Sequence, residues 1–410
     1  DWSSDVCSSD LRGFGGDTIA GMRITGGEMR GRVLKVPRAG MRPTQDRVRG
    51  SLFAILGNRV PGARILDLFH DYNSVGLTAV CDRGAAKDAI GRYQRMKEKG
   101  DLTLRIRCSH TFNTVGMWRT VEHALDEAIS HPLCRSGDDM LRVIGTKVWL
   151  DGGMLTGSAY MRQPWGVSRM YGISDPAYRG TLNIKHEDLL RMVDKVTSAG
   201  LQFTAHSVGD GAVHELLDVY EEVNKKHDIR ETRSCLTHSN FMSQEAVEHA
   251  AKLGVMMDIQ PIWLHLDSRT LLAQFGEERT KYFQPLKSIF EAGGVVGGGS
   301  DHMQKIGSFR SVNPYNPWLG MATAITRRAK WLYAPMHPEQ ALTREQAVQF
   351  YTINNAKIMF LDAATGSLEK GKYADMILLD RDVLTCPEDE IVGTKVLKTW
   401  LAGKLVFESR

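Results

Sequence analysis

From about residue 87 onward, short apolar segments alternate with longer amphipathic segments. The apolar segments have the length of buried strands, and apolar side chains in the segments between them recur at helical spacing. This alternation is typical of βα units that assemble a parallel sheet or barrel. Six strands and three helices are expected over Leu104–Cys108, Thr146–Leu150, Gln202–Ala205, Ser234–Thr237, Val255–Gln260 and Gly294–Gly298, and over Asp188–Ala199, Gly211–Asn224 and Ser243–Leu253. Because six strands do not close a (β/α)8 barrel, the pattern predicts an incomplete one.

Two further segments near the end of the chain, Ala374–Asp380 and Lys395–Phe407, are apolar enough to form strands. Because they follow the last βα unit, we expect them to pair as part of a small β-sandwich beside the barrel. The predicted fold class is therefore α/β, with a partial barrel over residues 87–360 and part of a β-sandwich over residues 361–410.

The segment before residue 87 has a different pattern. Met22–Arg32 alternates as a short strand and turn, Arg42–Arg49 starts a helix, and Ala63–Phe69 is an apolar run that predicts a buried strand. Residues 22–60 hold nine Lys and Arg against two Asp and Glu, although the formal net charge of the whole chain is only +4. A basic segment of this kind favours contact with RNA, and a solvated basic loop is the alternative.

The first 21 residues have neither an apolar period nor the pattern of a signal peptide. Residues 1–11 resemble the peptide obtained when sequencing-adapter DNA is translated in frame. We therefore interpret residues 1–21 as a spurious or disordered leader.

Composition excludes several classes of protein. A hydrophobic content of 42% and a charged content of 24% do not fit a disordered chain. The six cysteines are scattered without C-x-x-C spacing, which argues against a cysteine zinc site and favours a reducing, cytoplasmic location. No apolar run approaches the roughly 18 residues that span a bilayer, so no membrane partner is expected.

Candidate metal ligands stand at the ends of four predicted strands. Lys147 lies in the strand that runs into Asp151, and His206 and His238 close the two strands after it. Asp301 follows the last one. Because barrel enzymes place catalysis at the carboxyl ends of their strands, this ordered series predicts a divalent-metal centre. For any one histidine alone, a hydrogen-bonded loop residue is the simpler interpretation.

Residues 22–86 resemble the start of the 16S ribosomal RNA guanine-N2 methyltransferases. The resemblance rests on the string R-P-T-Q-D-R-V-R at 42–49 and on D-L-F at 67–69, which in that family opens the loop for S-adenosylmethionine. The loop that follows here, His70–Gly76, keeps one glycine, and the family's catalytic (N/D)-P-P-(Y/F) tetrad is absent. We therefore interpret residues 22–86 as a truncated methyltransferase-like fragment without methyl-transfer activity.

Residues from about 87 to 409 resemble amidohydrolase family 3, in its YtcJ-like and N-substituted-formamide-deformylase-like branch. The strings that carry the resemblance are K-V-W-L-D-G from Lys147, H-S-V-G-D from His206, L-T-H ending at His238, G-S-D ending at Asp301, and G-S-L-E-K-G-K-Y-A-D from Gly366. The resemblance implies hydrolysis of an amide or formamide C–N bond in a small-molecule substrate by metal-activated water, with Zn as the expected metal. In the family's pattern Lys147 is the position that can be carbamylated to bridge metals, and His206 and His238 are direct ligands. Asp301 is a ligand or the catalytic base that takes the proton of the water.

One family motif is missing. The first metal motif, H-x-H at the end of the first barrel strand, occurs nowhere among the 13 histidines. Missing strands also leave barrel edges with unpaired N–H and C=O groups, so we expect a chain that folds incompletely or is inactive. Two alternatives to the amidohydrolase function stay open. One is an RNA methyltransferase based on residues 22–86, and the other is an inactive fusion that contacts RNA. Because the two halves share no linker, composition or chemistry, a join of two unrelated genes explains the sequence best.

Overall fold

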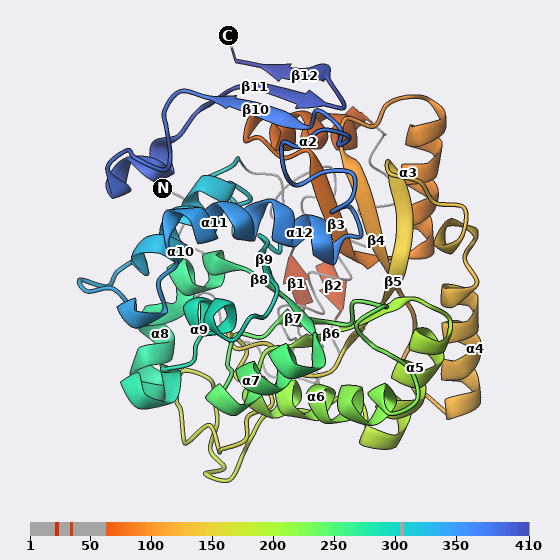
Figure 1. The fold of residues 1–410 in the computed structure, drawn as a ribbon. Helices are drawn as coiled ribbons and strands as arrows, with labels where there is room; N and C mark the ends of the chain where they lie inside the picture. Colours follow the sequence, from red (N-terminus) through yellow and green to blue (C-terminus); the bar gives the residue numbers. More distant parts are fainter. Residues whose placement is uncertain (1–20, 24–32, 36–62, 304–306, 410) are drawn as a thin grey trace. The chain divides into compact units, whose positions relative to one another are not determined.

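The computed structural model describes residues 21–23, 33–35, 63–303 and 307–409 (Figure 1). The chain divides into two units, Asp1–Val60 and Pro61–Arg410. In the first unit, strands β1 (Gly21–Arg23) and β2 (Val33–Lys35) form an antiparallel pair, in agreement with the strand expected near Met22. The helix expected from Arg42, most of the basic segment and the leader lie outside the described residues.

The described part of the second unit is built on one parallel sheet, whose seven strands follow one another in chain order. The strands are β3 (Ala79–Ala85), β4 (Arg105–Thr111), β5 (Leu141–Trp149), β6 (Gln202–Ser207), β7 (Cys235–His238), β8 (Met256–Ile259) and β9 (Val296–Gly298). Strands β3 and β9 end the order and each has a single neighbour in the sheet, so the sheet curls without closing (Figure 1). This confirms the incomplete barrel, with one strand more than the sequence pattern predicts.

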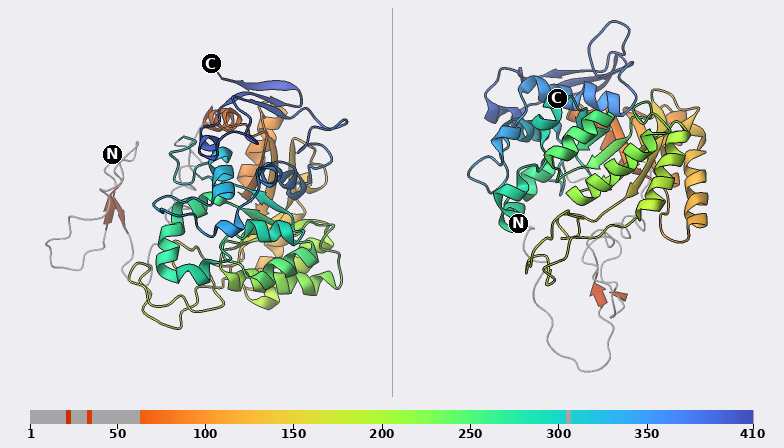
Figure 2. Two further views of the ribbon diagram at one scale, coloured as in Figure 1. Left: turned by 60° about the vertical axis from the view of Figure 1, so that its left-hand side comes forward. Right: turned by 60° about the horizontal axis from the view of Figure 1, so that its bottom comes forward.

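Helices α3 to α7 lie along the outside of the curled sheet, as Figures 1 and 2 show from three directions. Their apolar side chains, such as Val193 of α5 and Leu216 of α6, are fully buried in one core with strand residues such as Phe203. The helices of this unit are α2 (Ala63–Ser74), α3 (Lys87–Glu98), α4 (Trp118–Ile129), α5 (His186–Ser198), α6 (Asp210–Asn224), α7 (Gln244–Leu253), α8 (Pro261–Thr280), α9 (Leu286–Glu291), α10 (Pro317–Thr326), α11 (Arg344–Tyr351) and α12 (Ile353–Ile358), with short 3₁₀ helices at Pro132–Cys134, Pro338–Gln340 and Glu388–Gly393. Among the helices described, none combines the length and the apolar character required to cross a membrane.

The apolar run Ala63–Phe69 forms the first half of helix α2, so the strand expected there is wrong. Phe69 is buried, and Ile65 and Tyr72 pack against the core from the same side of the helix. Leu66, by contrast, is exposed. The three inward-facing residues are separated by four and then three positions, which is the spacing of an amphipathic helix. The loop expected after this run is helical as far as the end of α2.

The sequence pattern does not predict strand β3. Its second half carries Asp82 and Arg83, and charged residues there interrupt the apolar run that would mark a buried strand. Arg83 is nevertheless largely buried, at 13% exposure, and its guanidinium group forms an ion pair with Asp258 of β8 at 2.7 Å. The sheet therefore already contains residues that precede position 87, where the sequence pattern places the start of the barrel.

A three-stranded antiparallel sheet ends the chain. It consists of β10 (Met376–Leu379), β11 (Val396–Leu401) and β12 (Lys404–Glu408), in the order β10-β11-β12. This confirms the pairing expected for the C-terminal segments. Helix α2 packs against β11 and β12 (Figure 1). Arg105 of β4 binds Asp375 through two hydrogen bonds, of 2.7 and 3.0 Å, and both side chains are buried. The ion pair between Arg105 and Asp375 therefore connects the partial barrel to the segment that leads into the small sheet.

Candidate active site

All four predicted site residues lie at the carboxyl edge of the parallel sheet. Lys147 is two residues from the end of β5, and His206 is one residue from the end of β6. His238 ends β7, and Asp301 lies in the loop after β9. Because all these strands are parallel, their carboxyl ends meet at one edge, as the sequence analysis requires.

His206 and His238 are in direct contact. Their ring centroids are 4.6 Å apart and the ring planes are nearly perpendicular. Burial lowers the pKa of His206 well below its ordinary value of 6.5, and the neighbouring His238 and Lys147 lower it further. Burial is also the main cause that lowers the pKa of His238. Both imidazoles are therefore neutral near pH 7, which is the form that binds a metal.

The charge of Lys147 lowers the pKa of both histidines, and the charge of Asp301 raises that of His238. The Nζ atom of Lys147 lies 4.6 Å from the centroid of the Trp149 ring. Burial lowers the pKa of Lys147, and the carboxylates of Asp301 and Asp258 oppose this shift. The charge of Asp301 also reaches His238. The structure thus brings the four predicted residues into one electrostatic neighbourhood.

Two polar neighbours of the histidines are not predicted from the sequence, which are the hydrogen-bonded partner Gln260 and the nearby carboxylate of Asp151. Gln260 accepts a hydrogen bond of 2.6 Å from Nδ1 of His238. Asp151 lies 3.6 Å from Nε2 of His206 and accepts hydrogen bonds from the backbone N–H groups of Tyr160, Val208 and Gly209. Burial raises the pKa of Asp151 to about 7, although these three N–H groups favour its charged form. The rule that located the histidines also indicates Gln260, because it ends the predicted strand Val255–Gln260.

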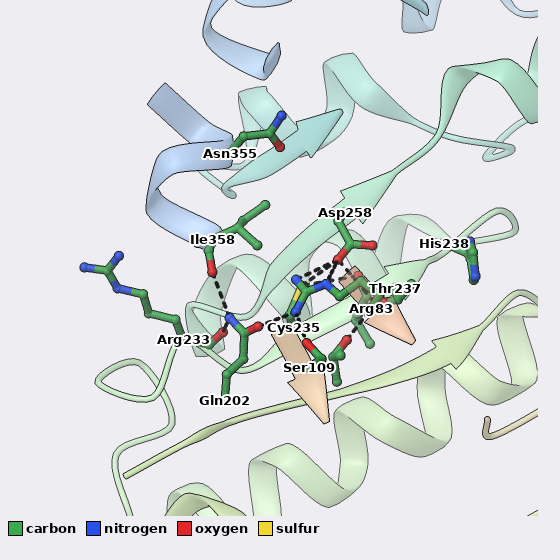
Figure 3. A network of polar contacts seen from close by, with 12 residues as sticks. Arg83, Ser109, Gln202, Arg233, Cys235, Thr237, His238, Asp258, Asn355 and Ile358 are labelled. Carbon is green, nitrogen blue, oxygen red and sulfur yellow. Dashed lines mark hydrogen bonds and ion pairs between the residues drawn. The ribbon is translucent and has the colours of Figure 1, made fainter. Parts of the chain in front are cut away.

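A polar network fills the interior of the curled sheet (Figure 3). At its centre the Arg83 guanidinium group donates hydrogen bonds to Asp258 at 2.8 Å and to Ser109 at 2.9 Å. The group also contacts Gln202 of β6. Thr237 of β7 donates to the same carboxylate at 3.2 Å. Strand β3, at one end of the sheet, and strand β8, next to the other end, are therefore joined through one largely buried ion pair.

The donors of this edge fit a divalent metal in chemistry. Neutral imidazoles and a carboxylate are ordinary ligands of Zn²⁺, and a lysine with a lowered pKa supplies the neutral amine that carbamylation requires. A complete metal site needs at least three such ligands close together. Within residues 63–303 and 307–409, no group of three or more His, Cys, Asp and Glu side chains could hold a metal ion. The contacting pair His206 and His238 is therefore the part of the candidate site best suited to hold a metal.

The buried histidines make folding stability depend on pH. Below pH 6.5 the unfolded chain binds protons at His206 that the native state does not bind, so stability falls as pH falls. Between pH 6.5 and 5.5 this histidine should lower the free energy of unfolding by about 1 kcal/mol. Asp151 acts in the opposite direction, because its raised pKa lets the native state take up a proton first.

We therefore expect the His206→Gln variant to lose about 1 kcal/mol less than the wild type over this interval. Urea unfolding at both pH values measures the difference. His123→Gln is the matched control for the loss of a histidine side chain, since His123 is exposed on α4. Equal pH dependence in the wild type and the His206 variant would contradict the assignment of a buried, neutral His206.

Comparison with known proteins identifies the class. The amidohydrolase family matches residues 62–407, so the chain belongs to this family. The chain is 25% identical over 321 residues to the putative amidohydrolase YtcJ of Bacillus subtilis, covering 77% of this chain and 54% of that protein. It is also 25% identical over 357 residues to the N-substituted formamide deformylase of Arthrobacter pascens, covering 84% and 60%. The chain thus spans little more than half the length of these relatives.

A solved structure shares the fold, and a second family matches the start of the chain. An uncharacterized metal-dependent hydrolase from Pyrococcus horikoshii superposes with a TM-score of 0.65 at 24% identity, covering 79% of this chain and 60% of that one. A family described as conserved hypothetical protein 95 matches residues 22–91. In this region the chain is 47% identical over 70 residues to ribosomal RNA small subunit methyltransferase D of Escherichia coli, covering 17% of this chain and 35% of that protein. Both resemblances seen in the sequence are therefore confirmed.

Proposed function

We propose that the chain is a metal-dependent amidohydrolase that hydrolyses an amide or formamide C–N bond in a small-molecule substrate. The observation that carries the proposal is the contact between two neutral histidines, the buried His238 and the largely buried His206, at the carboxyl edge of an amidohydrolase sheet. Lys147 and Asp301, whose charges act on His238, complete the proposed set. When bound, a divalent metal such as Zn²⁺ polarises a carbonyl group and lowers the pKa of bound water.

Each residue has a distinct proposed role. His206 and His238 hold the metal through one ring nitrogen each. Lys147, whose pKa burial lowers, is the position that binds carbon dioxide as a carbamate and so adds an oxygen ligand. Asp301 holds the metal or takes the proton from the attacking water, because a carboxylate is suited to both tasks. The substrate's nitrogen leaves as an amine.

The proposed site should bind its metal with low affinity. The H-x-H motif is absent from the sequence, and β3 and β9 each have one neighbour in the sheet. A metal held by the remaining ligands exchanges readily, so activity should depend on added metal. The second candidate function, contact with RNA through residues 22–60, rests on the methyltransferase-like match of that segment and on its charge.

The test is a hydrolysis assay on a panel of N-formyl and N-acyl amines with and without added Zn²⁺ or Mn²⁺, in which release of the amine is measured. We expect release that requires added metal and is absent from the His206→Ala/His238→Ala variant. Release that is independent of metal, or equal in the variant, would rule out the proposed centre. Binding of RNA that weakens steeply with salt, without hydrolysis of any amide, would favour the second function instead.

A further inference from the structure

The hydrogen bond between Gln260 and His238 has a direction that the surrounding groups determine. The Nε2 group of Gln260 lies 3.0 Å from the backbone carbonyl of Asp258 and 3.3 Å from its Oδ1 atom. Both of these atoms accept hydrogen bonds, so this end of the Gln260 side chain must be the NH₂ group. Its other end is the carbonyl oxygen Oε1, which lies 2.6 Å from Nδ1 of His238. An oxygen that can only accept requires a proton on Nδ1.

The rest of the network holds Gln260 in this orientation. Gln260 is buried, and its backbone carbonyl accepts a hydrogen bond of 3.0 Å from Nε2 of Gln284. Asp258, which fixes the NH₂ end, is itself held by Arg83 (Figure 3). The amide of Gln260 therefore links the interior ion pair to the site at the carboxyl edge of the sheet.

We propose that Gln260 is a positioning residue that keeps His238 in the Nδ1–H tautomer and so presents its unprotonated Nε2 atom to the metal. This inference deepens the proposed function and rests on it for the identity of the ligand. His206 is held in a complementary way, because its Nε2 atom lies 3.3 Å from the carbonyl oxygen of Gly152, which can only accept. Each of the two contacting imidazoles thus keeps one ring nitrogen free for a ligand.

The tautomer itself can be measured without any metal. We suggest nitrogen NMR of the full-length apo protein labelled with ¹⁵N-histidine at pH 8, with His238 assigned by its absence from a His238→Gln variant. In the wild type, Nδ1 should carry the proton. In Gln260→Met, which removes the acceptor at similar volume, the proton should move to Nε2. An Nε2–H tautomer in the wild type, or no change in Gln260→Met, would overturn the proposal.

Metal affinity gives a second readout that a purely structural role would not reproduce. In competition with a chromophoric chelator, Gln260→Met should weaken Zn²⁺ binding by about tenfold or more. Gln340→Met is the matched control, because it removes a buried glutamine whose amide is bonded to Ser288 and not to this network, and its affinity should stay near that of the wild type. In a His238→Ala background, Gln260→Met should cause no further loss of affinity.

Two outcomes separate this inference from the proposed function. If the wild type binds no Zn²⁺ but the tautomer responds to Gln260→Met as expected, the proposed function fails and the positioning role stands. If Zn²⁺ binds and Gln260→Met weakens it equally with and without His238, the proposed function stands and the positioning role fails.

Discussion

Replacing Arg83 by methionine should lower the free energy of unfolding by about 3–5 kcal/mol. The substitution keeps an unbranched apolar stem but leaves the largely buried carboxylate of Asp258 without its ion-pair partner, since both side chains are only 13% exposed. Removal of one member of a buried pair is strongly destabilising because the remaining charge cannot return to water. Urea unfolding of the wild type and the variant measures the loss.

Two controls show whether the loss comes from the buried charge. Arg381→Met removes an arginine whose partners Asp380 and Glu390 are at the surface, and should have little effect on the free energy of unfolding. The double variant Arg83→Met/Asp258→Asn should be more stable than the sum of the two single losses implies, because neither charge then remains. If Arg83→Met lowers the free energy of unfolding by less than about 1 kcal/mol, the ion pair does not stabilise the open sheet.

Replacing Asp301 by asparagine should reduce the rate of amide hydrolysis at saturating metal by about 10²–10⁴-fold. Asparagine keeps the size of the side chain but has neither the negative charge nor the basicity to accept a proton from water. Amine release with added Zn²⁺ measures the rate. Asp228→Asn is the control, since Asp228 is exposed and only accepts a hydrogen bond from the backbone of Arg230 in a turn.

The metal content of the Asp301 variant distinguishes its two proposed roles. Retention of metal with loss of rate assigns Asp301 as the base, whereas loss of both assigns it as a ligand. An unchanged rate in the presence of bound metal would exclude Asp301 from the reaction.

The spacing of apolar residues along the sequence was sufficient to predict most strands of the partial barrel. Strands such as β6 and β7 are short apolar segments whose ends carry His206 and His238, and the parallel topology then brings those ends together. The apolar pattern did not predict strand β3, because this strand contains the charged residue Arg83. The charge of Arg83 is compensated by Asp258, a residue far away in the sequence. A pattern of apolar residues cannot show such a partner.

Helix α2 shows a second limit of the sequence pattern. The run at Ala63–Phe69 contains too few polar residues to separate the helical period from the strand period. The structure decides between them, because Ile65, Phe69 and Tyr72 all reach the core from one side of a helix. In the site, residue types at strand ends located the histidines. The hydrogen bond that orients His238 was not predictable, because it depends on how the Gln260 amide meets the backbone of Asp258.

The measurement that tests the central claim most directly is the metal content of the purified protein beside its His206→Ala/His238→Ala variant. Both proteins are dialysed against the same buffer with low free Zn²⁺ and analysed for zinc by elemental analysis. We expect zinc clearly above background, and at most one per chain, in the wild type and none above background in the variant. Equal zinc in the two proteins, or none in a well-folded wild type, would contradict a metal centre built on these two histidines.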